Sequence, residues 1–255
     1  SFLAEGMNAA RIRHTNVVDV TDVGVVGELP YLVMSLLEGE DLAAAYARQG
    51  RFEIAELVDL LLPVAFAVAI GHCHGVVHRD LKPGNIFLHQ EGCRLIPKVL
   101  DFGVSRLLGA LRTKTPGRVF GTPLYMAPEQ ARGEPSDTRA DQYAVGVMLY
   151  QGLTGRLPRD SDEAEKLLHT VAYDSSPFAP PSRYVELPAG LEGAICRAMS
   201  YDPEQRFGSM HDLGQALQRR GFEMVIIDQH LEAALIPPVG VVRAGRVEGL
   251  ASQAL

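Results

Sequence analysis

One stretch of the sequence, residues 78–129, constrains the fold more than any other, because it is dense in Gly, Pro, Asp and Thr between helical patterns. So long an irregular connection is uncommon in a compact domain, and where it occurs it usually carries the functional site. It opens with His-Arg-Asp-Leu-Lys-Pro-Gly-Asn at 78–85 and, after two short strand-like runs, reaches Asp-Phe-Gly at 101–103. We therefore expect the chemistry to lie in this stretch.

Hydrophobic periodicity on either side of this stretch predicts the secondary structure. Residues 2–13 have a helical pattern, and residues 16–26 and 31–37 are strand-like runs separated by a Gly/Glu/Pro turn. After residue 39 the pattern changes to helices, and no repeat or low-complexity block divides the chain. The helices predicted there are 41–49, 53–74, 141–154, 187–200 and 209–219.

Composition and charge narrow the classes of function. With 47% hydrophobic and 22% charged residues the chain is ordinary for a globular protein, and its net charge of -7 gives no basic surface for nucleic acid or anionic lipid. Three scattered cysteines without CxxC spacing argue against disulfides or zinc and fit a cytoplasmic location. The longest apolar stretch, 57–70, is shorter than a membrane span of roughly 20 residues, so we expect a buried core helix.

The ordered motifs resemble those of one family. The motifs at 78–85 and 101–103 are followed by Gly-Thr-Pro-Leu-Tyr-Met-Ala-Pro-Glu-Gln at 121–130, and later by Asp-Pro-Glu-Gln-Arg-Phe ending at Phe207. In this order and spacing they resemble the eukaryotic-like serine/threonine protein kinases, in particular bacterial members, over residues 2–219.

The resemblance implies an α+β, two-lobed protein-kinase fold with a mainly helical C-lobe and an N-lobe truncated to one helix and a strand hairpin. Residues 1–37 would form the partial N-lobe, 38–221 the C-lobe and 222–255 a tail or linker. It also implies transfer of the γ-phosphoryl group of ATP, with Mg²⁺, to serine or threonine hydroxyls of protein substrates, including self-phosphorylation. No nucleic-acid partner and no membrane span are expected in this chain.

Phosphoryl transfer itself requires particular side chains. Divalent cations must spread the negative charge of the phosphates, and Asn85 and Asp101 offer the hard oxygen ligands that Mg²⁺ prefers. A carboxylate must accept the proton of the attacking hydroxyl, and Asp80 lies on the same loop as Asn85, so we assign Asp80 as the base. Lys82 is close enough in sequence to reach the transferring group, and in the family it marks the serine/threonine branch.

Further residues are placed at the nucleotide by the resemblance. Glu5 corresponds to the helix glutamate that orients a phosphate-binding lysine, with an ordinary surface charge as the alternative. Asp41 would contact the ribose, although an N-cap of the following helix explains it equally well. The resemblance identifies residues 35–37 as the hinge, the segment whose backbone groups would bond the adenine edge. Ser35 stands where the family commonly has an acidic residue, and we expect the backbone contacts to be unaffected. The residues expected at the nucleotide are Met34, Ser35, Leu36, Leu37, Asp41 and Phe87.

Other motif residues have structural roles in the family. Glu129 and Arg206 would form a buried ion pair that ties the substrate loop to the helical lobe. Asp141 would hold the catalytic-loop backbone or, alternatively, complement the dipole of its helix. At the end of helix 53–74 we expect no functional site. His72, Cys73 and His74 are expected to cap the helix or face solvent.

Regulation is suggested by Arg79 beside the proposed base. An arginine there can pair with a phosphothreonine and order the segment that follows Phe102. Thr113 and Thr115 are the candidate phosphorylation sites, with ordinary polar loop residues as the alternative. Thr122 is expected to shape the substrate groove.

Two ATP-clamping elements of the family are absent from this sequence. No glycine-rich loop precedes Glu5, and no lysine precedes Lys82. Losing one preorganised donor costs roughly 10² to 10³ in rate, so we expect the chain as given to be nearly inactive. Two explanations are open: a fragment of an active kinase, which the intact motifs favour, or a truncated pseudokinase that acts as an interaction module.

Overall fold

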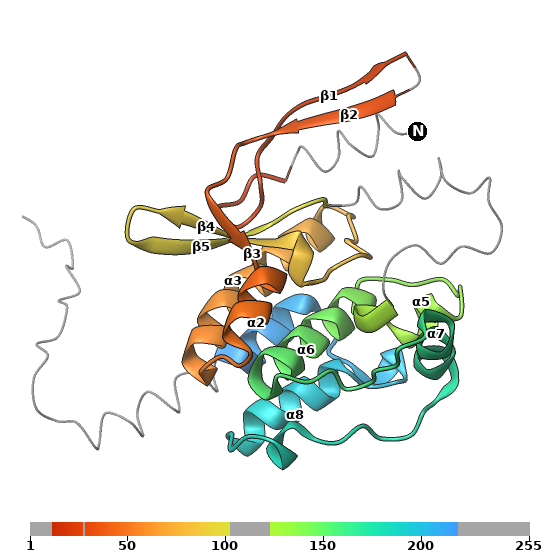
Figure 1. The fold of residues 1–255 in the computed structure, drawn as a ribbon. Coiled ribbons are helices and arrows are strands. Elements are labelled where there is room, and N and C mark those ends of the chain that lie inside the picture. Colours follow the sequence, from red (N-terminus) through yellow and green to blue (C-terminus); the bar gives the residue numbers. More distant parts are fainter. Residues whose placement is uncertain (1–11, 28, 103–122, 219–255) are drawn as a thin grey trace, which may run out of the picture.

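A computed structural model describes residues 12–27, 29–102 and 123–218. Within them a strand hairpin stands apart from a mainly helical body, and a small three-stranded sheet lies between the two (Figure 1). The predicted helix over 2–13 lies outside the described residues. The strands and helices are β1 Val20–Val26, β2 Leu29–Met34, β3 Gly39–Asp41, α2 Leu42–Gln49, α3 Ile54–Cys73, β4 Ile86–Glu91, β5 Arg94–Val99, α5 Pro128–Ala131, α6 Arg139–Thr154, α7 Ala164–Tyr173, α8 Ala189–Ala198 and a helix over 210–218.

The predicted hairpin is confirmed. β1 and β2 pair antiparallel from Val20 opposite Met34 to Val26 opposite Leu29, and among the described residues they pair only with each other. The chain just before β1 joins the hairpin to the body, because the N–H of Val18 donates to the carbonyl oxygen of Val99 in β5 (3.0 Å). The segment that leads into the hairpin is therefore attached to β5 of the small sheet.

The small sheet consists of β3, β4 and β5, all antiparallel. The two strands expected inside the loop-rich stretch are confirmed as β4 and β5. The sequence did not predict β3, which is only three residues long. It approaches β4 closely at Gly39, whose φ is +133°, and a side chain there would lie 2.1 Å from the carbonyl oxygen of Leu88.

The core of the helical body is built around α6. Fourteen of its residues are buried, which is why the sequence is apolar around most of the helix. α3 packs against it, and Gly152 lets the two helices approach, because a side chain at this position would lie 2.6 Å from Leu57. Tyr46 of α2 donates its hydroxyl hydrogen to the carbonyl oxygen of Met148 (2.8 Å).

The apolar stretch at 57–70 belongs to α3, which lies in the core as predicted. Leu57, Leu61, Val64 and Val68 are fully buried. In the described part of the chain α3 alone has the length and apolarity that could cross a membrane, and half of its most apolar 18-residue window is buried inside the fold. Burial in the core accounts for its composition.

Two elements of the helical body were not predicted. α5 and α7 follow the loop-rich stretch, and α7 buries Leu167, Val171 and Ala172. The predicted helices at 41–49, 53–74, 141–154, 187–200 and 209–219 are all present within two residues of their expected ends, or to the limit of the described residues. The division of the chain at residues 37 and 221 stays a prediction.

Candidate active site

The loop between α3 and β4 is fixed by hydrogen bonds from both neighbouring parts of the fold. Asp141, in the first turn of α6 and 1% exposed, accepts hydrogen bonds from the N–H groups of His78 (Oδ2, 2.9 Å) and Arg79 (Oδ1, 2.8 Å). The His78 ring bonds the carbonyl oxygen of Leu100 through Nε2 (2.9 Å). The backbone that leads into Asp80 is therefore held by α6 on one side and by the end of β5 on the other.

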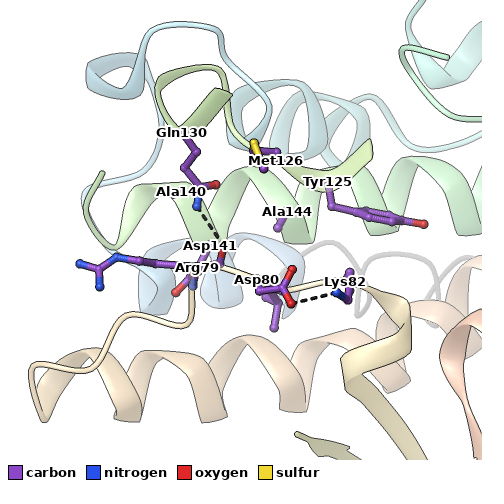
Figure 2. A pocket seen from close by; sticks show the side chains of 10 residues that line it. Arg79, Asp80, Lys82, Tyr125, Met126, Gln130, Ala140, Asp141 and Ala144 are labelled. Atoms are coloured by element: carbon purple, nitrogen blue, oxygen red, sulfur yellow. Dashed lines mark hydrogen bonds and ion pairs between the residues drawn. The ribbon is translucent and has the colours of Figure 1, made fainter. Parts of the chain in front are cut away.

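Three predicted site residues converge on this loop. Lys82 Nζ lies 2.8 Å from Asp80 Oδ2, and the two side chains face each other in Figure 2. The amide of Asn85 donates to the carbonyl oxygen of Asp80 (2.7 Å) and to its Oδ2 (3.3 Å). Asn85 is placed by a 3₁₀ turn over Pro83–Asn85, which Pro83 begins with its fixed φ. A carboxylate, an ammonium group and an amide thus share one small site.

His72 was misjudged from the sequence. Its Nε2 lies 2.7 Å from Asp141 Oδ2, and its side chain is only 9% exposed, so it neither caps α3 nor faces solvent. It supports the carboxylate that holds the loop. His74 behaves as expected, because it is exposed and bonds the carbonyl oxygen of Ile70 in its own helix (2.8 Å).

The donor set at Asn85 and Asp101 fits a magnesium ion. Because the Asn85 amide nitrogen faces Asp80, its Oδ1 is directed elsewhere, and no described residue donates to that oxygen or to the Asp101 carboxylate. No group of three or more His, Cys, Asp or Glu side chains among the described residues could hold a metal. One amide oxygen and one carboxylate suit Mg²⁺, which usually takes one or two protein ligands and completes its shell with waters and phosphates.

Asp101 also connects the loop to the hairpin. A small cavity is lined by Met34 and Leu32 of β2, by Val18 and by Asp101 with Phe102. Phe102 is buried, with its ring centroid 5.2 Å from that of His78. Met34, which precedes the predicted hinge, and Asp101, a predicted metal ligand, therefore border one cavity.

The predicted hinge follows β2 directly. Ser35 donates its N–H to the carbonyl oxygen of Asp19 (2.9 Å), whereas the N–H groups of Leu36 and Leu37 donate to no described residue. Asp41 caps α2, because its Oδ1 accepts from the N–H of Ala44 (2.8 Å). Phe87 lies opposite Asp41 in the β3–β4 pairing.

A buried ion pair fixes α5 to the helical body. Arg206 and Glu129 form a two-bonded ion pair (2.7 and 2.9 Å) with exposures of 2% and 5%, as the sequence predicted. The Arg206 guanidinium also donates to the carbonyl oxygens of Ser200 (2.9 Å) and Arg139 (3.0 Å). All its polar contacts are therefore inside the protein, which secures α5 against the helical body.

A cavity of about 30 Å³ opens between the loop and the segment that precedes α5. Asp80, Lys82, Tyr125 and Met126 are among its lining residues (Figure 2). Burial raises the pKa of Tyr125 to about 12, so its hydroxyl stays protonated at neutral pH and donates to Gln151. Asp80 thus borders a pocket that is lined by the neutral hydroxyl-bearing side chain of Tyr125 as well as by the charged Lys82. The predicted site residues Glu5, Thr113, Thr115 and Thr122 lie outside the described residues.

Comparison with known proteins agrees with this geometry. The crystal structure of the Mycobacterium tuberculosis PknI kinase domain, a double mutant, superimposes with a TM-score of 0.67 and 25% identity over 86% of this chain and 77% of that one. The two-lobed α+β kinase fold predicted from the sequence is therefore confirmed. Residues 1–217 match the family described as "Protein kinase domain", and the chain belongs to this family.

The curated relatives that the chain resembles include bacterial serine/threonine-protein kinases. It is 41% identical over 220 residues to the serine/threonine-protein kinase Pkn1 of Myxococcus xanthus, covering 85% of this chain and 31% of the relative. It is 37% identical over 205 residues to the serine/threonine-protein kinase PkaA of Streptomyces coelicolor, covering 80% and 37%. The chain thus spans about a third of the length of these relatives.

Proposed function

We propose that this chain contributes the catalytic loop of an enzyme that transfers the γ-phosphoryl group of ATP to serine or threonine hydroxyls of protein substrates. The observation that carries the proposal is the convergence of Asp80, Lys82 and Asn85 on a loop fixed by Asp141. Membership of the protein kinase family and the names of the bacterial relatives support the same reaction.

The proposed reaction gives each loop residue a task. Asp80 accepts the proton of the attacking hydroxyl, and its side chain is 46% exposed, so a substrate can reach it. Lys82 lies 2.8 Å from Asp80 and carries the positive charge that would stabilise negative charge on the transferring group. Asn85 orients Asp80 through its amide hydrogens.

Magnesium and ATP are the cofactors that this arrangement fits. When bound, Mg-ATP supplies the phosphoryl group, and the metal neutralises charge on the phosphates. Asn85 Oδ1 and the Asp101 carboxylate would hold the ion. The N–H groups of Leu36 and Leu37, which donate to no described residue, are the candidate contacts for the adenine edge, and Phe87 and Asp41 are the candidates beneath the base and at the ribose.

The test is transfer from radiolabelled Mg-ATP by the full-length gene product. Asp80→Asn should reduce the labelling of a serine/threonine substrate by 10² or more, the range expected for loss of a general base. Asp59→Asn is the matched control, because Asp59 is an exposed residue of α3 away from the loop, and it should keep wild-type activity. Equal activity of the two variants would reject Asp80 as the base.

Control by phosphorylation forms a finer part of the proposal. The Arg79 guanidinium pairs with no carboxylate in the described parts of the chain and points away from Asp80 in Figure 2. It is therefore available for a phosphothreonine, with Thr113 and Thr115 as candidates. Phosphosite mapping after incubation with Mg-ATP should find one of them, and Arg79→Ala should remove any activation that follows.

An interaction module, which would keep the kinase fold without transferring phosphate, is the alternative outcome of the same experiment. Nucleotide binding measured by calorimetry, together with the labelling assay, separates the two, because a module gives no labelling that depends on Asp80.

A further inference from the structure

The structure assigns a positioning role to Gln130, through which α5 holds the catalytic loop. This inference rests on the proposed phosphotransfer and deepens it. Gln130 follows Glu129 directly and lies half-buried beside the cavity that Asp80 lines. Among the described residues of α5, Gln130 alone hydrogen-bonds the loop through its side chain, and Figure 2 shows that side chain reaching toward Arg79.

Both ends of the Gln130 amide are used. Nε2 donates to the carbonyl oxygen of Arg79 (3.0 Å), and Oε1 accepts from the N–H of Ala127 (3.1 Å). Because Ala127 offers a donor and Arg79 an acceptor, the orientation of the amide is determined by chemistry. A side chain that can only accept would satisfy Ala127 and fail at Arg79.

The bond falls on a strained residue. Arg79 has φ of +65°, a left-handed conformation that a residue with a side chain adopts at a cost of order 1–3 kcal/mol. Its N–H is held by Asp141 from α6, and its carbonyl oxygen is held by Gln130 from α5. The peptide groups on both sides of Arg79 are therefore fixed, and the second of them leads directly into Asp80.

This arrangement connects the Glu129–Arg206 ion pair to the catalytic loop. Glu129 secures α5 through its buried pair with Arg206, and the next residue holds the backbone before Asp80. The position of α5 therefore affects the orientation of the Asp80 carboxylate. The Gln130 amide bonds the backbone of Ala127 and Arg79, so we place its effect on the reaction at Arg79.

The test compares Gln130→Glu, Gln130→Ala and the exposed control Gln205→Glu in the full-length gene product. At pH 8 the glutamate accepts from Ala127 but faces the Arg79 carbonyl without a proton to donate. We expect kcat to fall about tenfold, the rate equivalent of one hydrogen bond, with KM for ATP within about twofold of wild type. Gln205→Glu should match wild type.

A pH profile separates positioning from a merely structural role. A protonated glutamic acid can donate to the Arg79 oxygen as the amide does, and a facing carbonyl raises the pKa of a carboxyl group from its ordinary value of about 4.3. The ratio of Gln130→Glu to wild-type kcat should therefore rise severalfold between pH 8 and pH 5.5. The same ratio for Gln130→Ala should be flat. Equal slopes for the two variants would overturn the inference.

Hydrogen exchange of the backbone over residues 76–81 gives a readout that needs no activity. Both Gln130 variants should exchange faster than wild type there, and Gln205→Glu should not. Unchanged exchange would overturn the role of Gln130 whatever the kinetics. If exchange responds as expected but the wild type transfers no phosphate, the proposed function fails and the mechanical link stands.

Discussion

Replacing Asp141 by asparagine should loosen the catalytic loop more than its conservative size suggests. The carboxylate accepts three hydrogen bonds, from His72 and His78 at Oδ2 and from Arg79 at Oδ1. An amide has one accepting end, so at least one backbone N–H would face an NH₂ group. In the orientation that keeps the two bonds at Oδ2, the N–H of Arg79 loses its partner.

The cost can be worked from these contacts. Leaving a buried N–H unsatisfied costs about 1–3 kcal/mol, and replacing a charged acceptor by a neutral one weakens each remaining bond by roughly 0.5–1 kcal/mol. We therefore expect Asp141→Asn to lose about 3 kcal/mol of stability, which corresponds to a fall in Tm of about 6–12 °C for a domain of this size.

Thermal melting of the full-length gene product measures this loss, and hydrogen exchange locates it at the amides of His78 and Arg79. Asp137→Asn is the matched control, because Asp137 lies just before α6 with a side chain that is 55% exposed and that, of the residues that the structure describes, hydrogen-bonds only Arg139. Its cost should stay below about 1 kcal/mol. If the two variants melt together, the three-bond account of Asp141 is wrong.

Two further predictions concern packing and pH. Gly71→Ala should destabilise the protein by about 1–3 kcal/mol, because the new methyl group would lie 2.3 Å from the Phe102 ring. Gly193→Ala is in an open position of α8 and should stabilise the protein by up to about 1 kcal/mol. Equal shifts of the two variants in a urea titration would contradict this prediction. Hydrogen bonds from Ser176 hold the pKa of Asp174 at about 2, below its usual 3.8. A carboxyl group with a depressed pKa stabilises the fold above about pH 4, and this stabilisation is lost as the pH falls toward 2. The difference in stability between wild type and Asp174→Asn should therefore shrink over that interval. A constant difference would refute this prediction.

Much of the secondary structure could be read from local patterns. α2, α3 and α6 follow from apolar periodicity, and Asp41 caps α2 as its position before the helix suggested. α7 was not predicted, although Leu167 and Val171 stand four residues apart as on an amphipathic helix. β3 was not predicted, because three residues beginning with glycine carry no strand pattern, and its existence depends on β4.

The residues of the candidate site also differ in whether local sequence patterns or long-range contacts identify them. The convergence of Asp80, Lys82 and Asn85 could be predicted from the sequence, because one short motif keeps these groups close along the chain. His72 was misjudged, since its partner Asp141 lies 69 residues away and nothing beside His72 in the sequence announces it.

The sequence by itself determined which chemical groups this chain carries and the order in which they occur, because those follow from residue identity and spacing. Tertiary structure alone decided how they are held. The left-handed backbone at Arg79 is kept in place by Asp141 and Gln130, which stand 62 and 51 residues away. Such contacts form only when α5 and α6 pack against the loop, and hydrogen-bond geometry between distant segments leaves no local trace in a sequence.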